Sequence, residues 1–173
     1  MENRRLYGDA KLIEALLGKM QLVEESEGGF AAVYKDAASR AFWLKYYAMA
    51  GSQGGGYLTL LKLPTPSTAE LINIAIVSEF EDEAVAAMLR LLDEETIEKK
   101  DFRLQLIKEL EHANQRDQNK KLRILGIIKL TGLDDPMNRR GLLHKSTIEI
   151  QADADYFRTI ADRAEALLGQ LNL

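Results

Sequence analysis

The stretch from Ser67 to Leu92 constrains the fold most, because it joins the chain's longest uncharged, mainly apolar run to its densest acidic cluster. Residues 71–77 form the apolar run, which gives a helix almost no polar side and therefore predicts a buried helix. Ser67 and Glu70 have capping-box spacing, so this helix is expected to run from about Thr68 to Ser78. A buried strand is the alternative, since Ile and Val dominate the run. We expect the rest of the chain to pack around this stretch.

The chain before Pro64 has the pattern of a small sheet. Asp9 is expected to cap a short helix that stops at Gly18. Alternating or aromatic-rich segments then predict strands at 20–24, 30–36, 41–50 and 57–63. Because the links between these strands are short, they favour an antiparallel meander of three to four strands.

The chain after Pro66 has the 3.6-residue period of helices. Residues 81–93 and 101–116 carry apolar stripes, with Asp101 expected to cap the second of these helices, and residues 120–130 predict another. Asp153 is expected to cap a final helix. Residues 145–151 are expected to form a short strand, since Ile148 and Ile150 alternate with polar neighbours.

The predicted fold class is therefore α+β. A short helix precedes a three- to four-stranded antiparallel meander, which packs on a mostly helical C-terminal region of about five helices. The 173 residues fit a single domain with a sheet portion at 1–63 and a helical portion at 64–173.

Composition excludes several classes of site. The chain has no cysteine, which excludes disulfides, thiolate catalysis and cysteine-ligated metals. Its net charge of −4 disfavours nucleic acid and anionic membranes as general partners. No segment has the length of a signal peptide's apolar core or of a membrane span, so we expect a cytoplasmic protein that does not bind membranes.

No motif supports a catalytic or cofactor site. The glycines of 51–56 precede a strand rather than a helix and lack the lysine of a phosphate-binding loop. Glu109 and His112 form a single Glu-x-x-His, whereas a di-iron bundle needs two and further glutamates. We therefore expect no cofactor, and we favour a non-enzymatic protein without excluding an enzyme.

The leading hypothesis is a protein-interaction module that binds a basic partner through an acidic helical surface. Residues 64–100 carry a net charge of −6 and residues 101–145 a net charge of +4, although solvated or mutually neutralising helices show the same pattern. One acid in the first turn is enough for a favourable interaction with the helix dipole, and this cluster has more acids than that. The predicted partner-binding residues are Glu79, Glu81, Asp82, Glu83, Glu94 and Glu95. In overall profile, small, acidic and cysteine-free, the chain is similar in type to bacterial immunity proteins that neutralise toxins.

Two other sites are alternatives. The 131–145 loop carries Arg139, Arg140 and His144, which could hold a phosphate or carboxylate in an enzyme or a small-ligand-binding protein. The sheet could place Lys35, Lys45, Lys62, Trp43 and Tyr47 on one face, a combination that suits single-stranded nucleic acid. Trp43, Tyr47 and Met49 could instead form a patch that joins two copies of the chain.

Overall fold

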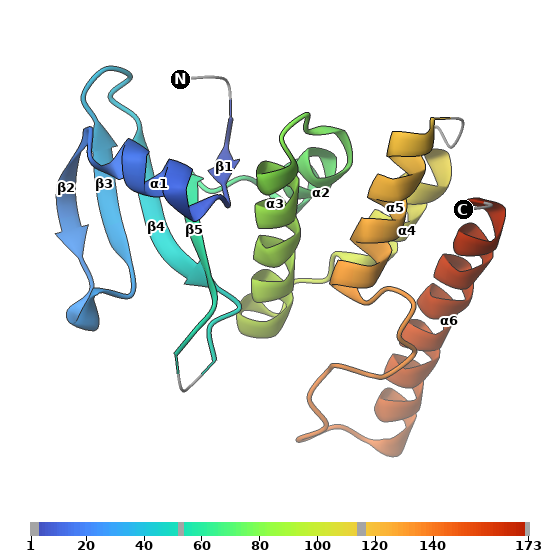
Figure 1. Ribbon diagram of the computed structural model, residues 1–173. Coiled ribbons are helices and arrows are strands. Elements are labelled where there is room, and N and C mark those ends of the chain that lie inside the picture. Colours follow the sequence, from blue (N-terminus) through green and yellow to red (C-terminus); the bar gives the residue numbers. More distant parts are fainter. Residues whose placement is uncertain (1–3, 52–53, 114–116, 172–173) are drawn as a thin grey trace. The chain divides into compact units, whose positions relative to one another are not determined.

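The computed structural model describes residues 4–51, 54–113 and 117–171 (Figure 1). The chain divides into two compact units, Met1–Lys100 and Asp101–Leu173, which we call unit 1 and unit 2. The boundary expected at 63/64 therefore falls inside unit 1, where two helices belong with the sheet. The α+β class is confirmed, and five helices follow residue 64 in the described chain. That the whole chain is one domain stays a prediction.

Unit 1 is built on a five-stranded antiparallel sheet in the order β1-β5-β4-β3-β2. Its strands are β1 Leu6–Tyr7, β2 Met20–Glu25, β3 Ala32–Asp36, β4 Phe42–Ala48 and β5 Tyr57–Lys62. Strands β2 to β5 form the predicted meander. The two-residue strand β1 was not predicted, and it pairs with β5 at one edge of the sheet.

Helix α1, Ala10–Leu17, begins and ends as the sequence predicts. The Asp9 side chain accepts a hydrogen bond from the Leu12 N–H, and Gly18 follows the last turn. The hairpin between β2 and β3 turns through Glu27–Gly29, where Gly28 has a φ of 83°. A side chain is disfavoured in this left-handed conformation, which explains glycine at this position.

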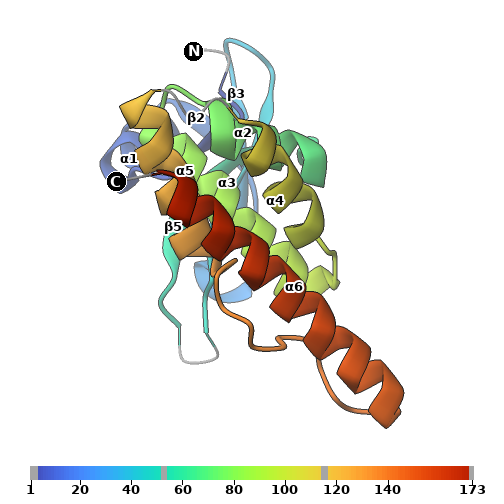
Figure 2. The same ribbon diagram turned by 90° about the vertical axis from the view of Figure 1, so that its right-hand side faces the viewer.

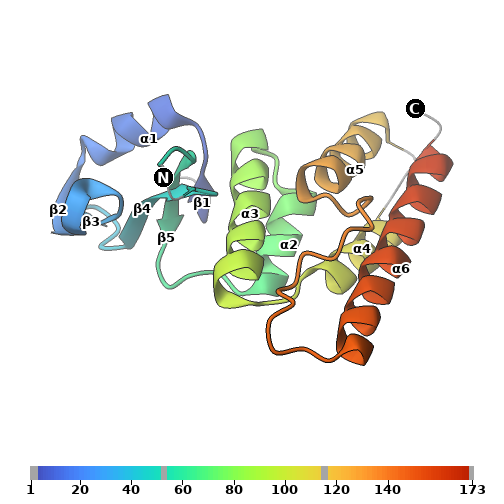
Figure 3. The same cartoon turned by 90° about the horizontal axis from the view of Figure 1, so that it is seen from below.

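Helices cover both faces of the sheet in unit 1 (Figure 3). Leu60 and Leu61 are neighbours on β5 and therefore point to opposite faces, yet both are fully buried. On the first face, Ile13 of α1 packs with Tyr7, Trp43 and Leu60. Helix α3, Glu81–Asp93, contacts β1 and β4 and covers the second face at this end of the sheet.

The apolar run lies in helix α2, Thr68–Val77, so the helix prediction is confirmed and the strand alternative is wrong. Ser67 and Glu70 form the complete capping box, and Leu71 and Ile72 are buried. Helix α3 continues into a five-residue π-helix, Glu94–Glu98, and ends at Lys99 with a φ of 58°.

Unit 2 consists of helices α4 Arg103–His112, α5 Gln118–Thr131 and α6 Thr147–Leu171 (Figure 2). Arg103 is buried, and its Nη1 donates to the carbonyl oxygens of Thr131 (3.2 Å) and Gly132 (3.1 Å). Its guanidinium also lies 5.3 Å from the ring centres of Phe102 and Phe157. The last carbonyl groups of a helix have no partner within the helix and attract positive charge. The Arg103 guanidinium therefore stabilises the C-terminus of α5 and links it to α4.

The start of α6 corrects two predictions. Residues 147–151 are helical, so the expected strand at 145–151 is wrong. Ser146 and Glu149 exchange the hydrogen bonds of a second capping box, which fixes the helix start. Asp153 is therefore not a cap; it lies within α6 and pairs with Arg140 (2.7 Å) and Lys145. Asp101 does accept a hydrogen bond from the Arg103 N–H, although Phe102 is the residue that precedes α4.

Candidate functional site

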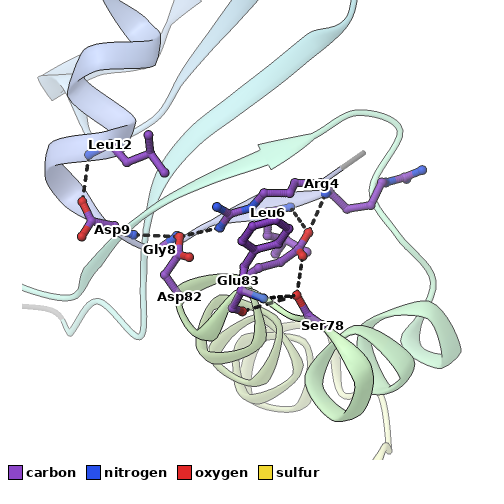
Figure 4. Close-up of polar contacts among 10 residues, drawn as sticks. Arg4, Leu6, Gly8, Asp9, Leu12, Ser78, Asp82 and Glu83 are labelled. Carbon is purple, nitrogen blue, oxygen red and sulfur yellow. Dashed lines mark hydrogen bonds and ion pairs between the residues drawn. The ribbon is translucent and has the colours of Figure 1, made fainter. Parts of the chain in front are cut away.

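The acidic cluster at the start of α3 holds the N-terminal segment of the chain (Figure 4). The Asp82 carboxylate accepts from the Arg4 guanidinium at 2.6 Å. It also accepts from the N–H groups of Gly8 (3.1 Å) and Asp9 (3.3 Å). Burial opposes ionisation of Asp82, but the donors from Gly8 and Arg4 outweigh it and hold its pKa below the ordinary value.

Glu83 anchors the same segment one residue further along α3. Its Oε1 accepts from the N–H groups of Arg5 (2.7 Å) and Leu6 (3.3 Å), and its Oε2 accepts from the Ser78 hydroxyl (2.6 Å). The residue is buried. These bonds satisfy two backbone donors beside β1, which explains how a two-residue strand keeps its place.

Arg4 completes this anchor. The side chain is only 4% exposed, and its guanidinium lies 4.2 Å from the Tyr7 ring centre and 4.4 Å from that of Phe80. A guanidinium between two aromatic rings and beside a carboxylate is stabilised by both kinds of contact. We call Arg4, Asp82 and Glu83 the α3 anchor.

Glu94, at the end of α3, also has partners within unit 1. It is 1% exposed, forms ion pairs with Arg90 Nε at 3.2 Å and Lys100 Nζ at 3.7 Å, and accepts a hydrogen bond from the Thr68 hydroxyl at 3.3 Å. The preceding residue, Asp93, accepts from the Met49 N–H at 2.9 Å, and burial raises its pKa. This end of α3 therefore carries local ion pairs, and hydrogen bonds join it to α2 and to the residue after β4.

The predicted partner-binding acids thus divide into two groups. Asp82, Glu83 and Glu94 bind other parts of unit 1, whereas Glu79 and Glu81 are exposed and Glu95 is half-buried. Much of the surplus charge in the cluster holds the N-terminal segment. Among the partners in the N-terminal segment, only the Arg4 side chain is a cation that the sequence marks; the donors at residues 5–9 are backbone N–H groups.

The alternative ligand site has its cations paired. Arg140 binds Asp101 (2.9 Å) and Asp153 (2.7 Å), and it stacks on Tyr156 at 4.3 Å. Arg139 binds Asp135 at 2.9 Å, while His144 is exposed in the loop. An anion would have to compete with carboxylates for both guanidinium groups. The use of this loop as a ligand site stays a prediction.

The sheet brings four of the five side chains expected for nucleic acid to one face, but the Trp43 ring among them is buried. Residues opposite each other in an antiparallel pair share a face, and so do alternate residues of one strand. Lys62 therefore lies with Trp43, Lys45 and Tyr47, whereas Lys35 lies with Phe42 on the other face. Trp43 is buried and cannot stack on a base or form a patch between copies. Tyr47 and Met49 are exposed, and self-association through them stays a prediction.

A mixed acidic and apolar surface lies instead at the free edge of the sheet. All residues of 21–28, which include most of β2, are exposed. Leu22 is 47%, Val23 52% and Phe30 63% exposed. The acids of this segment are Glu24, Glu25 and Glu27. We call Leu22–Glu27 together with Phe30 the β2 edge surface; sequence reasoning assigned these residues only to a strand and its turn.

A concave region of about 570 Å³ lies where α1 meets the β3–β4 turn. Its lining consists of Leu16, Lys19, Met20 and residues 36–39. The Asp36 carboxylate accepts from the Ser39 hydroxyl and from the N–H groups of Ala38 (3.2 Å) and Ser39 (3.1 Å). Hydrogen bonding to Ser39 lowers its pKa despite the effect of burial. The carboxylate therefore stabilises the turn.

No family model, curated protein or solved structure matches the chain. Within the described residues, no three metal-binding side chains of the His, Cys, Asp and Glu types come together. None of the helices described has both the length and the apolar character needed to cross a membrane.

Proposed function

We propose that this protein is a non-catalytic interaction module that binds a basic protein partner through unit 1. Unit 1 contains eleven lysines and arginines against sixteen acids, a net charge of −5, whereas unit 2 has a net charge of +1. Complementary charge accelerates encounter and disfavours wrong partners. The acidic character therefore belongs to the unit that carries the sheet.

The observation that carries the proposal is the β2 edge surface. Exposed large apolar side chains are ordinary when scattered, but here Leu22, Val23 and Phe30 accompany three exposed acids within nine residues. Interfaces combine apolar contact, which supplies free energy, with charge, which supplies selectivity. An immunity-type role, in which the partner is a basic toxin, is one form of this proposal.

The geometry also decides which acids a test should change. Reversal of Asp82 or Glu83 would break the α3 anchor and so would test folding rather than binding. We therefore choose the triple reversal E24K/E25K/E27K. The matched control is E109K/D162K/E165K, which makes the same charge change at three exposed acids of unit 2.

The experiment is affinity capture of the tagged protein from its native host, followed by titration of the captured partner with each variant. We expect the E24K/E25K/E27K variant to lose a basic partner and the control variant to keep it, with both melting near the wild-type temperature. If the two variants bind the partner equally well, or lose it equally, the interaction does not use the β2 edge surface.

A further inference from the structure

Strand β2 is an open edge of the sheet. It is six residues long, and within the described residues its only strand neighbour is β3. The opposite edge, β1, has two residues and is held by the α3 anchor. An edge strand presents unpaired N–H and C=O groups on its outer side, which form a template for another strand. Only the β2 edge therefore has the length to receive one.

The side chains of this edge disfavour a second copy of the same protein. If two β2 strands paired in parallel, they would bring together four glutamates, Glu24 and Glu25 of each chain, beside the two Glu27 side chains of the adjacent turns. Like charges opposite each other in a sheet destabilise the pair. The same three glutamates stabilise a strand that carries lysine or arginine, so the edge discriminates by charge.

A bulge limits how far an added strand can run. The β2–β3 register shifts between Leu22 and Glu24, which leaves residues 20–22 and 24–25 in regular pairing with β3. Bulges increase the local twist and interrupt flat pairing. A short extended segment fits such an edge, whereas an indefinite stack of strands does not.

We propose that the β2 edge binds an extended basic segment of a partner protein, which adds to the sheet as a sixth strand. This inference rests on the proposed function, because it names the chemistry of the partner at the same surface. Main-chain hydrogen bonds to β2 supply affinity, and side chains alternate along the added strand. Glu24 pairs with Val33 and Glu25 with Ala32, so these two glutamates lie on opposite faces, and Glu27 lies in the turn just beyond β2. Lysines or arginines on one face of the added strand meet one of the two strand glutamates, and its apolar side chains contact Leu22 and Val23.

The probe is a fluorescent ten-residue peptide of alternating lysine and valine. Two derivatives carry backbone N-methyl groups, one on every lysine and the other on every valine. Because successive residues of an extended strand donate to opposite edges and every second residue donates to the same edge, each derivative has one edge blocked. Strand addition therefore predicts that one derivative binds at least about tenfold more weakly than the other, since several main-chain hydrogen bonds are lost.

Binding is measured by fluorescence anisotropy and by hydrogen exchange of the full chain. We expect the unmodified peptide to slow exchange of β2 amides, and to bind E24K/E25K/E27K at least about tenfold more weakly than the unit 2 control variant. If both methylated peptides bind alike and β2 amides exchange as before, strand addition is wrong.

The failure of strand addition can be told from the failure of the proposed function. A peptide that does not bind, together with a captured partner that still depends on Glu24, Glu25 and Glu27, overturns strand addition alone. A captured partner that is indifferent to these glutamates overturns both. Self-association that E24K/E25K/E27K abolishes would show that the edge receives a second copy, and this too overturns the basic segment.

Discussion

Replacement of Glu83 by alanine should detach the N-terminal strand from the sheet. The Glu83 carboxylate is the acceptor for the N–H groups of Arg5 and Leu6 and for the Ser78 hydroxyl. The Leu6 N–H would lose its partner at a buried site, whereas the Arg5 N–H and the Ser78 hydroxyl are partly buried, and the hydroxyl also donates to the Phe80 carbonyl at 3.3 Å. A buried donor without a partner costs about 1–3 kcal/mol, and partial exposure lowers this cost, so the three donors together would cost about 3–5 kcal/mol if the structure stayed rigid.

Detachment of β1 is an alternative to leaving these donors without partners, and the lower of the two free-energy costs sets the expected loss of stability. If β1 leaves the sheet, its backbone groups regain water, but Leu6 and Tyr7 lose their burial, which is worth roughly 1.5–3 kcal/mol for each such side chain. The smaller of the two costs applies, so we expect Glu83→Ala to lower the free energy of unfolding by about 3–5 kcal/mol. Glu83→Gln keeps one acceptor oxygen but loses the charge, and it should cost about 1–2 kcal/mol.

Trp43 provides the assay, because it is the chain's single tryptophan and its ring lies 5.5 Å from that of Tyr7. Departure of β1 exposes Trp43 and shifts its emission to the red, while urea unfolding gives the change in stability. Glu79→Ala, at an exposed acid of the same cluster, is the matched control and should stay within about 0.5 kcal/mol of wild type. If Glu83→Ala matches this control in both stability and emission, the anchoring role is refuted.

Three further predictions concern other contacts. The pKa of the Asp82 carboxyl is lower in the folded protein than in the unfolded chain. The ionised carboxylate therefore adds to the free energy of unfolding above the unfolded pKa, and this stabilisation is lost as pH falls through the folded pKa. Urea unfolding should show that the difference in stability between wild type and Asp82→Asn disappears below about pH 4. Arg103→Met leaves the carbonyl groups of Thr131 and Gly132 without this donor and should cost about 2–4 kcal/mol in thermal unfolding; an unchanged melting temperature would contradict it. Ser67→Ala removes the cap of α2 and should cost about 1 kcal/mol, whereas Ser67→Asp should restore most of this stability.

Local signals predicted much of the fold. Asp9, Ser67 and Gly18 marked helix ends correctly. The side chains of Asp9 and Ser67 accept hydrogen bonds from N–H groups three residues further along the chain, so the signal for a helix start is local. The start of α6 had an equally local signal in Ser146 and Glu149. The alternation of two isoleucines nearby suggested a strand instead, and that preference was wrong.

The candidate site was harder to predict because a carboxylate's partners are often backbone N–H groups. Such donors occur at nearly every residue and have no signature in the sequence. Asp82 and Glu83 find theirs at residues 5–9, at sequence separations of 73 to 78. An acid that anchors a distant segment and an acid that meets a partner are therefore identical in sequence, and only the three-dimensional contacts distinguish them.

The α3 anchor also has a consequence for the order in which unit 1 can assemble during synthesis. Residues 4–9 leave the ribosome about 75 residues before Asp82 and Glu83 do, and the pairing partner of β1, β5, also comes later. Hairpins β2–β3 and β3–β4 need only neighbouring chain and can form early, since short loops close at low entropic cost. The most N-terminal strand is thus among the last to be placed, and until α3 emerges the nascent sheet exposes β5 as a second open edge.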